Sequence, residues 1–235
     1  MTPGPLILVG GAEFTPGNEE QDELFVRAAA VGTAFAVPTA AARQRPDLAT
    51  RHAQEWFATL GGKLENLPVV SRRDAASEDL AALAGIGRGF YFVGGDPGLT
   101  VDVLRGSKVW EAMATGWRNG AVLAGSSAGA MALCEWSLVH ARTKGDRNRR
   151  FKDALGLVAG VVVAPHFDGF GARWVDSVKQ TGREVTMLGL DERTAAVFDK
   201  EEWRVLGPGR VTVIGPTATA SFSSGDLIDG LPTPA

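Results

Sequence analysis

The sequence has very little cysteine or histidine. It holds one cysteine, Cys134, and three histidines among its 235 residues. A single cysteine excludes an intramolecular disulfide and is typical of proteins in a reducing compartment, so we expect a cytoplasmic location. So few cysteines and histidines, scattered along the chain, give no zinc-binding spacing. We therefore expect neither a metal nor any other cofactor.

Long apolar runs and a secretory signal pattern are also missing. No apolar stretch approaches the roughly 18 residues that suggest a membrane span. The first residues lack a basic region followed by a long apolar core, which is the pattern of a signal peptide. We therefore expect no membrane partner.

The chain is nearly balanced in charge. Lysine and arginine number 24 and aspartate and glutamate 27, for a net charge of −3, and 45% of the residues are hydrophobic. This composition excludes a disordered, collagen-like or coiled-coil chain. A slightly negative chain has no overall attraction for nucleic acid, so we expect no such partner. A basic cluster lies within Ala141–Lys152, and a solvated loop is expected there.

Short apolar runs alternate with helix-like segments over the first ~165 residues, which indicates a mainly parallel sheet covered on both faces. The last four predicted strands are closely spaced and are expected to be antiparallel. We expect one α/β hydrolytic domain over residues 1–222 and a polar, proline-containing tail over 223–235. The predicted strands are Pro5–Val9, Thr33–Val37, Leu67–Val70, Gly89–Val93, Ala121–Ala124, Leu157–Ala164, Thr186–Leu190, Thr194–Phe198, Trp203–Leu206 and Val211–Val213. The predicted helices are Glu19–Ala30, Leu48–Leu60, Ala75–Leu83, Lys108–Arg118, Ala128–Trp136 and Trp174–Thr181, with another that begins at Pro97.

The segment Gly125–Gly129 is a Gly-x-Ser-x-Gly motif between a predicted strand and a predicted helix. In that setting the motif predicts a nucleophile elbow, a tight turn that lifts the Ser127 hydroxyl above the sheet edge. The Ala128 N–H then falls at a helix N-terminus, where it would stabilise an oxyanion. The alternative is a glycine- and serine-rich loop that only packs closely. The strand–turn–helix context favours the catalytic interpretation.

A nucleophilic serine needs a base, and three histidines are available. His52 lies in a predicted amphipathic helix, and His140 lies beside a charged stretch, so both are expected at the surface. His166 directly follows the predicted strand Leu157–Ala164 and Pro165. It therefore falls at the same sheet edge as Ser127, where a general base would be placed.

A carboxylate is expected to orient the histidine. Asp191 and Glu192 both follow the predicted strand Thr186–Leu190, and Asp168 is a weaker competitor because it lies only two residues past His166. Spacing alone leaves these alternatives open, and an ordinary solvated turn is the other interpretation. The order serine, histidine, acid differs from the order serine, acid, histidine of α/β-hydrolases.

A glycine pair, Gly94 and Gly95, ends the predicted strand Gly89–Val93 and could direct N–H groups over the same edge. Asp96 and Pro97 then form a helix start, because aspartate is a good N-cap and proline is favoured at the first helical position. The pair is therefore a candidate oxyanion-binding loop, a structural turn, or both.

Taken together, these motifs resemble the peptidase E and cyanophycinase family of serine peptidases. The resemblance covers most of the chain. It rests on Leu6–Glu13, Phe92–Asp96, Ala124–Ala130, Pro165–Phe167 and Gly189–Ala195.

This resemblance implies a three-layer α/β/α sandwich related to class I glutamine amidotransferases. It also implies that Ser127 is the nucleophile and His166 the base. The glutamate of the cyanophycinase branch falls on Glu192, with Asp191 as the reserve candidate, and the oxyanion N–H groups fall on Gly95 and Ala128.

Substrates in the family carry aspartyl groups, so a small peptide is the expected partner, and a homodimer is implied. Dipeptides with an N-terminal aspartyl residue are the first expectation, and a β-aspartyl substrate of the cyanophycinase type is the alternative. Asp96 is a candidate for substrate contact. So is one basic residue, either Arg173 or a member of the cluster, which is Arg142, Lys144, Arg147, Arg149, Arg150 and Lys152.

Other functions remain as alternatives. A different amide or ester could be hydrolysed on the same scaffold. A catalytically silent binding protein of the same fold would form no acyl-enzyme. A nucleic-acid binder using the basic cluster would bind with strong salt dependence.

Overall fold

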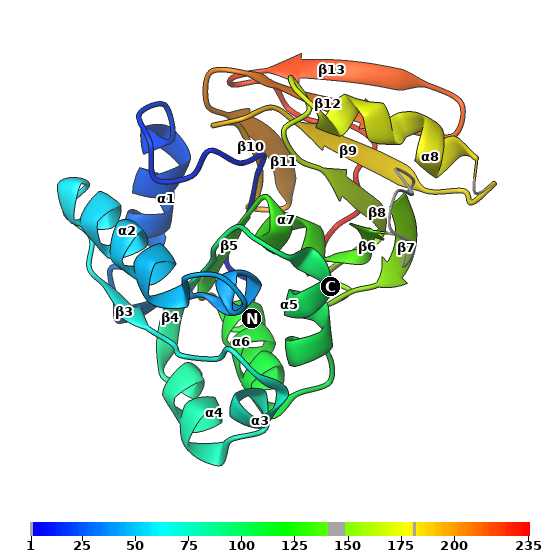
Figure 1. The fold of residues 1–235 in the computed structure, drawn as a ribbon. Helices are drawn as coiled ribbons and strands as arrows, with labels where there is room; N and C mark the ends of the chain where they lie inside the picture. Colours follow the sequence, from blue (N-terminus) through cyan, green and yellow to red (C-terminus); the bar gives the residue numbers. More distant parts are fainter. Residues whose placement is uncertain (1, 141–148, 181) are drawn as a thin grey trace.

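The computed structural model describes residues 2–140, 149–180 and 182–235. Two β-sheets stand side by side, with helices around the first (Figure 1). The first sheet has the order β11-β10-β1-β5-β4-β2-β3 and the second the order β13-β12-β9-β8-β6-β7. The strands of the first sheet are β1 (Leu6–Val9), β2 (Thr33–Val37), β3 (Leu64–Asn66), β4 (Gly87–Phe92), β5 (Val122–Ser126), β10 (Ala195–Asp199) and β11 (Glu202–Leu206). Those of the second are β6 (Cys134–His140), β7 (Arg149–Asp153), β8 (Val158–Ala164), β9 (Thr186–Leu190), β12 (Arg210–Ile214) and β13 (Thr219–Ser223).

The first sheet is parallel from β1 to β3, with β10 and β11 added antiparallel at one edge. Parallel strands need crossover connections, and helices supply them. The α-helices are α1 (Glu19–Ala29), α2 (Pro46–Thr59), α3 (Arg72–Ala75), α4 (Glu78–Gly85), α5 (Pro97–Leu104), α6 (Lys108–Arg118), α7 (Ala128–Leu133) and α8 (Val175–Lys179), and the 3-10 turns are η1 (Thr39–Ala41) and η2 (Gly171–Trp174).

Side-chain alternation along β1 divides the core in two. Ile7 and Val9 point into the cluster that holds Phe25 of α1 and Phe57 of α2. Leu6 and Leu8 point to the other face, into a larger cluster formed with α5, α6 and α7 and with strands of the second sheet. Both faces of the strand are fully buried, which is why its sequence is continuously apolar instead of alternating.

The predicted α/β class, with a mainly parallel sheet and antiparallel C-terminal strands, is confirmed. The second sheet was not separated from the first in the sequence analysis. The predicted helix Ala128–Trp136 was wrong in its second half, because α7 ends at Leu133 and β6 begins at Cys134. The carbonyls of Leu133 and Cys134 accept N–H groups from Leu157 and Gly156, so pairing with a distant segment overrides the local helical tendency.

Three smaller predictions also need correction. The predicted strand Leu67–Val70 is displaced to Leu64–Asn66, because that segment pairs with β2 and Pro68 cannot donate to a ladder. The predicted helix Ala75–Leu83 is two short helices, α3 and α4, which are capped by Ser71 and Ser77. The basic cluster is not wholly a loop, because its end forms β7, paired antiparallel with β6. Arg142, Lys144 and Arg147 lie outside the described residues.

The segment after β13 lies against both sheets. The Ile228 N–H donates to the Trp203 carbonyl, and the Ala235 N–H donates to the Leu157 carbonyl. The Trp203 indole N–H donates to the Pro232 carbonyl at 2.9 Å. Ile228 itself is buried in the larger core cluster. In the described part of the chain, no helix has the length and apolar character needed to cross a bilayer.

One carboxyl group is buried in the smaller core. Asp22 of α1 is 0% exposed, and its Oδ2 accepts the indole N–H of Trp56 at 2.7 Å. Its Oδ1 and the nearby Tyr91 hydroxyl find no hydrogen-bond partner among the described residues. Burial raises the pKa of Asp22 from 3.8 to about 8, against the smaller opposing effect of the Trp56 hydrogen bond. The folded protein therefore holds this carboxyl neutral at pH 7.

We expect the Asp22→Asn variant to resist alkaline destabilisation. Between pH 4 and 8 the unfolded chain loses the Asp22 proton and the folded chain keeps it, so the free energy of unfolding falls as pH rises. The amide keeps the acceptor for Trp56 and removes the titration. Relative to wild type, the variant should gain on the order of 2 kcal/mol or more between pH 5 and pH 8. Denaturant unfolding at both pH values measures this gain. The exposed Asp47→Asn is the control, and equal pH slopes in all three proteins would contradict the expectation.

Candidate active site

Ser127 stands on a sharp turn between β5 and α7. Its φ of 48° and ψ of −108° are unusual for a residue with a side chain. The turn requires glycine on both sides. A Cβ on Gly125 would lie 2.6 Å from the Gly129 carbonyl carbon, and one on Gly129 would lie 2.4 Å from the Phe92 carbonyl oxygen. The predicted strand–elbow–helix geometry is therefore present.

His166 follows β8 and faces the serine. Its Nε2 lies 3.1 Å from the Ser127 Oγ. Its Nδ1 lies 2.7 Å from Oε1 of Glu192, which follows β9. The imidazole thus joins a hydroxyl to a carboxylate, in the arrangement that lets a histidine take a serine proton while its charged form is stabilised.

The other candidate carboxylates are turned elsewhere. The Oδ2 of Asp191 accepts the Arg210 N–H at 2.9 Å, which ties it to β12. Burial raises the pKa of Asp191 above its ordinary value. Asp168 accepts the backbone N–H of Glu192 at 3.1 Å and so supports the loop of that residue. Only Glu192 of these three contacts the imidazole.

Val9 at the end of β1 and the two glycines after it hold all three segments together. The Val9 carbonyl accepts the Ser127 N–H at 2.9 Å, the Gly10 carbonyl accepts the His166 N–H at 2.8 Å, and the Gly11 carbonyl accepts the Arg193 N–H at 2.9 Å. These successive carbonyls therefore fix the serine, the histidine and the residue after Glu192. The role of Gly10 and Gly11 was missed in the sequence analysis, although a glycine pair after the first strand was its signal.

Gly95 and Ala128 lie beside Ser127 in one cavity. The Gly94 N–H donates to Glu13, and the Asp96 N–H donates to the Ala40 carbonyl. Between them, the Gly95 N–H has no acceptor among the described residues. The φ of Gly95 is 143°, and a Cβ there would lie 2.3 Å from the Ala40 oxygen, so glycine is required.

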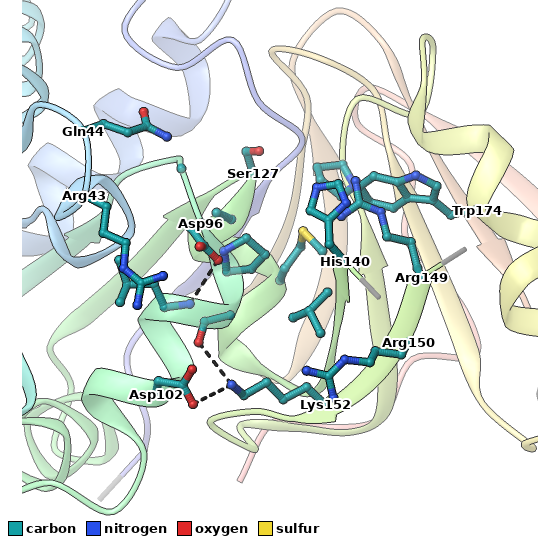
Figure 2. A pocket seen from close by; sticks show the side chains of 18 of the residues that line it. Arg43, Gln44, Asp96, Asp102, Ser127, His140, Arg149, Arg150, Lys152 and Trp174 are labelled. Carbon is teal, nitrogen blue, oxygen red and sulfur yellow. Dashed lines mark hydrogen bonds and ion pairs between the residues drawn. The ribbon is translucent and has the colours of Figure 1, made fainter. Parts of the chain in front are cut away.

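This cavity has a volume of about 450 Å³, which suits a small ligand. Figure 2 shows Arg43 and Gln44 on the side opposite Arg149 and Trp174, with Ser127 between them. The other side chains labelled in Figure 2 also line the cavity: Asp96, Asp102, His140, Arg150 and Lys152.

The cavity is rich in positive charge, and its cations differ in how they are paired. Lys152 forms an ion pair with Asp102 at 2.5 Å. Among the described residues, no carboxylate lies within ion-pair distance of Arg43, Arg149 or Arg150. The Oδ1 of Asp96 caps α5 by accepting the Leu99 N–H at 3.0 Å, which confirms the predicted helix start.

An aromatic wall runs from the histidine to Arg149. The Phe170 ring stacks on the His166 ring with centroids 4.9 Å apart, and the Trp174 ring is 5.6 Å from that of Phe170. The Arg149 guanidinium lies 4.3 Å from the centroid of the Trp174 ring. Burial lowers the pKa of Arg149 below its ordinary value. Phe170 and Trp174 were not identified from the sequence, because their role depends on rings that meet in space.

Arg173 does not line the cavity; it is an exposed residue of η2. Of the basic cluster, the cavity wall contains the members that lie on β7. His52 and His140 are exposed, as predicted, although His140 borders the cavity. In the ranges that the structure describes, no group of three or more metal-binding side chains is present.

We expect Gly11→Ala to separate the histidine from the serine. A Cβ on Gly11 would lie 2.3 Å from Cε1 of His166, and the φ of 120° is already unfavourable for alanine. The Ser127 Oγ to His166 Nε2 distance should exceed the hydrogen-bond limit of about 3.5 Å. Crystal structures would measure this distance. Gly120→Ala is the control, because its φ is 96° and no atom lies within 4 Å of a Cβ there. An unmoved imidazole in Gly11→Ala would contradict the expectation.

Known proteins are similar to this chain over most of its length. A cyanophycinase of Trichormus variabilis is 29% identical over 220 residues, which cover 90% of this chain and 74% of the relative. A cyanophycinase of Synechococcus elongatus is 28% identical over 223 residues, covering 91% and 68%. The solved structure of a peptidase from an acI-B1 Actinobacterium matches with a TM-score of 0.85 and 27% identity over 96% of both chains.

The model of peptidase family S51 matches residues 6–206, which is most of the chain. The resemblance to the peptidase E and cyanophycinase family is thereby confirmed. The chain is a peptidase that belongs to family S51.

Proposed function

We propose that this peptidase works through an acyl-enzyme on Ser127. The observation that carries the proposal is the hydrogen-bonded series Ser127, His166 and Glu192, with distances of 3.1 and 2.7 Å. The Ser127 Oγ attacks the scissile carbonyl carbon while the His166 Nε2 takes the hydroxyl proton. The Glu192 carboxylate holds the imidazole in the required tautomer and stabilises its charged form.

The negative charge on the attacked carbonyl oxygen needs donors that are already in place. The N–H groups of Gly95 and Ala128 supply them in this proposal, because both residues border the cavity beside Ser127. His166 then gives its proton to the leaving amine, and the C–N bond breaks. Water attacks the acyl-enzyme with His166 again as base, which restores the free hydroxyl.

The substrate we propose is a short peptide with an aspartyl residue, of which a dipeptide with an N-terminal aspartyl group is the first candidate. Positive charge supports this class, since Arg43, Arg149 and Arg150 border the cavity without a carboxylate partner among the described residues. An arginine recognises a carboxylate through paired, charge-assisted hydrogen bonds. A β-aspartyl peptide is the second candidate, and the observation that favours it is the similarity to cyanophycinases over 90% of the chain.

Ser127→Ala is expected to keep the fold and lose activity. Removing the nucleophile should lower kcat by roughly 10³-fold or more. Mass spectrometry would measure product release from a panel of Asp-Xaa dipeptides, β-Asp-Arg and dipeptides with neutral N-terminal residues. Release from Asp-Xaa assigns the first candidate, and release from β-Asp-Arg the second. Near-normal turnover by the variant would contradict the mechanism, and no release by folded wild type would favour a silent binding protein.

Arg149→Gln is expected to weaken binding of the acidic substrate. A charge-assisted hydrogen bond to a carboxylate is worth enough that KM should rise roughly tenfold or more. Turnover should change less, because Arg149 does not touch the serine or the histidine. Steady-state kinetics would separate the two parameters. Arg173→Gln is the control from the same chain, because Arg173 lies outside the cavity. A larger effect in Arg173→Gln would contradict the assignment.

A further inference from the structure

The loop between β1 and α1 sends one carboxylate across to two other strands. Glu13 is half-buried, and both of its oxygens are used. Oε1 accepts the Gly94 N–H at 2.8 Å, just past the end of β4. Oε2 accepts the hydroxyl of Ser126 at 2.8 Å, at the end of β5. This side chain therefore joins the glycine loop to the residue that precedes Ser127.

We infer that Glu13 is a positioning residue. It orients the Gly95 N–H toward the carbonyl group of the substrate, and it fixes the turn that carries Ser127. The inference rests on the proposed acyl-enzyme function and adds a residue with no role in it so far. The carboxylate of Glu13 is hydrogen-bonded to Gly94 and Ser126 and not to the Ser127 hydroxyl or the imidazole, so it acts through those two residues.

The Gly95 N–H belongs to a peptide unit that is held on both sides. The preceding N–H, of Gly94, donates to Glu13. The following N–H, of Asp96, donates to the Ala40 carbonyl at 2.9 Å. With its neighbours committed in this way, the peptide between Gly94 and Gly95 has little freedom to turn. Removing the Glu13 carboxylate breaks the first of these two hydrogen bonds, the one from the Gly94 N–H.

Glu13 also distinguishes the two adjacent serines. Ser126 is 0% exposed, and its hydroxyl proton is donated to Glu13. The Ser126 hydroxyl therefore forms a structural hydrogen bond with Glu13, whereas the Ser127 hydroxyl is the one hydrogen-bonded to His166. Because the bond fixes the residue that enters the elbow, it constrains the backbone from which the nucleophile projects.

The loop around Glu13 holds an unfavourable conformation. Ala12 and Phe14, on either side, have φ values of 53° and 60°, in the left-handed region that residues with a Cβ avoid. The buried Asn18 side chain sustains the loop by donating to the Ala12 carbonyl at 2.8 Å and to the Thr15 carbonyl at 3.0 Å. Such backbone strain is typical of sites where a side chain must be aimed. Here the strained backbone at Ala12 and Phe14 orients the side chain of Glu13.

Glu13→Ala tests the inference through the split between turnover and binding. Loss of an aligned oxyanion donor typically lowers kcat by ~10² or more, so we expect a fall of at least about 50-fold with KM within about threefold. Glu13→Gln should recover most of the activity, because its amide oxygen can accept from Gly94 and its NH₂ can donate to the Ser126 Oγ. The matched control is Glu19→Ala, which removes a carboxylate of the same region that, within the described residues, accepts only the Gly17 N–H. It should keep kcat and KM near those of wild type.

A fluorophosphonate probe that reacts with Ser127 reports on the same site without a peptide substrate. Slowing of the labelling rate in Glu13→Ala by the same order as kcat, with an unchanged melting temperature, supports the inference. Labelling and turnover at wild-type rates would overturn it. If Glu13→Ala does not fold, Glu13→Asp decides, because it keeps the charge but is too short to span both partners, and full activity in it overturns the inference. If wild type is neither labelled at Ser127 nor active, the proposed function itself fails, which is a distinguishable result.

Discussion

The site depends on the end of β1 and the two glycines that follow it more than on any single side chain. The carbonyls of Val9, Gly10 and Gly11 accept the backbone N–H groups of Ser127, His166 and Arg193 in succession. The three incoming segments are thus anchored on three consecutive residues of the chain. The absence of a Cβ at Gly11 leaves room for the imidazole, since a Cβ would lie 2.3 Å from its Cε1. Backbone bonds, which no surface substitution removes, therefore set the distances between the nucleophile, the base and the acid.

The two sheets contribute different parts. Ser127 follows β5 of the first sheet, whereas His166 and Glu192 follow β8 and β9 of the second. After Glu192 the chain returns to the first sheet as β10, which pairs with β1. Because α7 ends early, at Leu133, the chain starts the second sheet directly after this short helix, as β6, which pairs in parallel with β8. The series of three side chains thus spans the junction of the sheets. The cavity is lined both by loops that follow strands of the first sheet and by β6 and β7 of the second.

Much of this arrangement could be predicted from local patterns, and the remainder depends on contacts between distant segments. The elbow and His166 were recognisable because a strand, a glycine-bounded serine and a strand-ending histidine are each local in sequence. The choice between Asp191 and Glu192 was not local. The two side chains point in different directions from the same turn. The Asp191 carboxylate accepts the backbone N–H of Arg210 on a later strand, and the Glu192 carboxylate is hydrogen-bonded to the imidazole. The second sheet was missed for the same reason, because the helix ends at Leu133 and a strand begins at Cys134 where distant Leu157 and Gly156 donate hydrogen bonds to these two residues. Glu13 was visible in its motif, but its contacts with Gly94 and Ser126 join strands far apart in the chain.

The balance of charge shows why composition is a poor guide to a ligand. The whole chain carries a net charge of −3, yet basic side chains from the loop after η1 and from β7 line the cavity. The nearby carboxylates cancel only part of this charge. Asp102 pairs with Lys152, and Asp96 caps α5, so neither forms an ion pair with Arg43, Arg149 or Arg150. Arg149 keeps its guanidinium over the Trp174 ring, which holds the cation in place by attraction to the ring face without neutralising it. An arginine stays protonated at neutral pH even when partial burial lowers its pKa. A cation held by an aromatic ring keeps its hydrogen-bond donors available, and this is the condition for recognising a carboxylate within a cavity of this size.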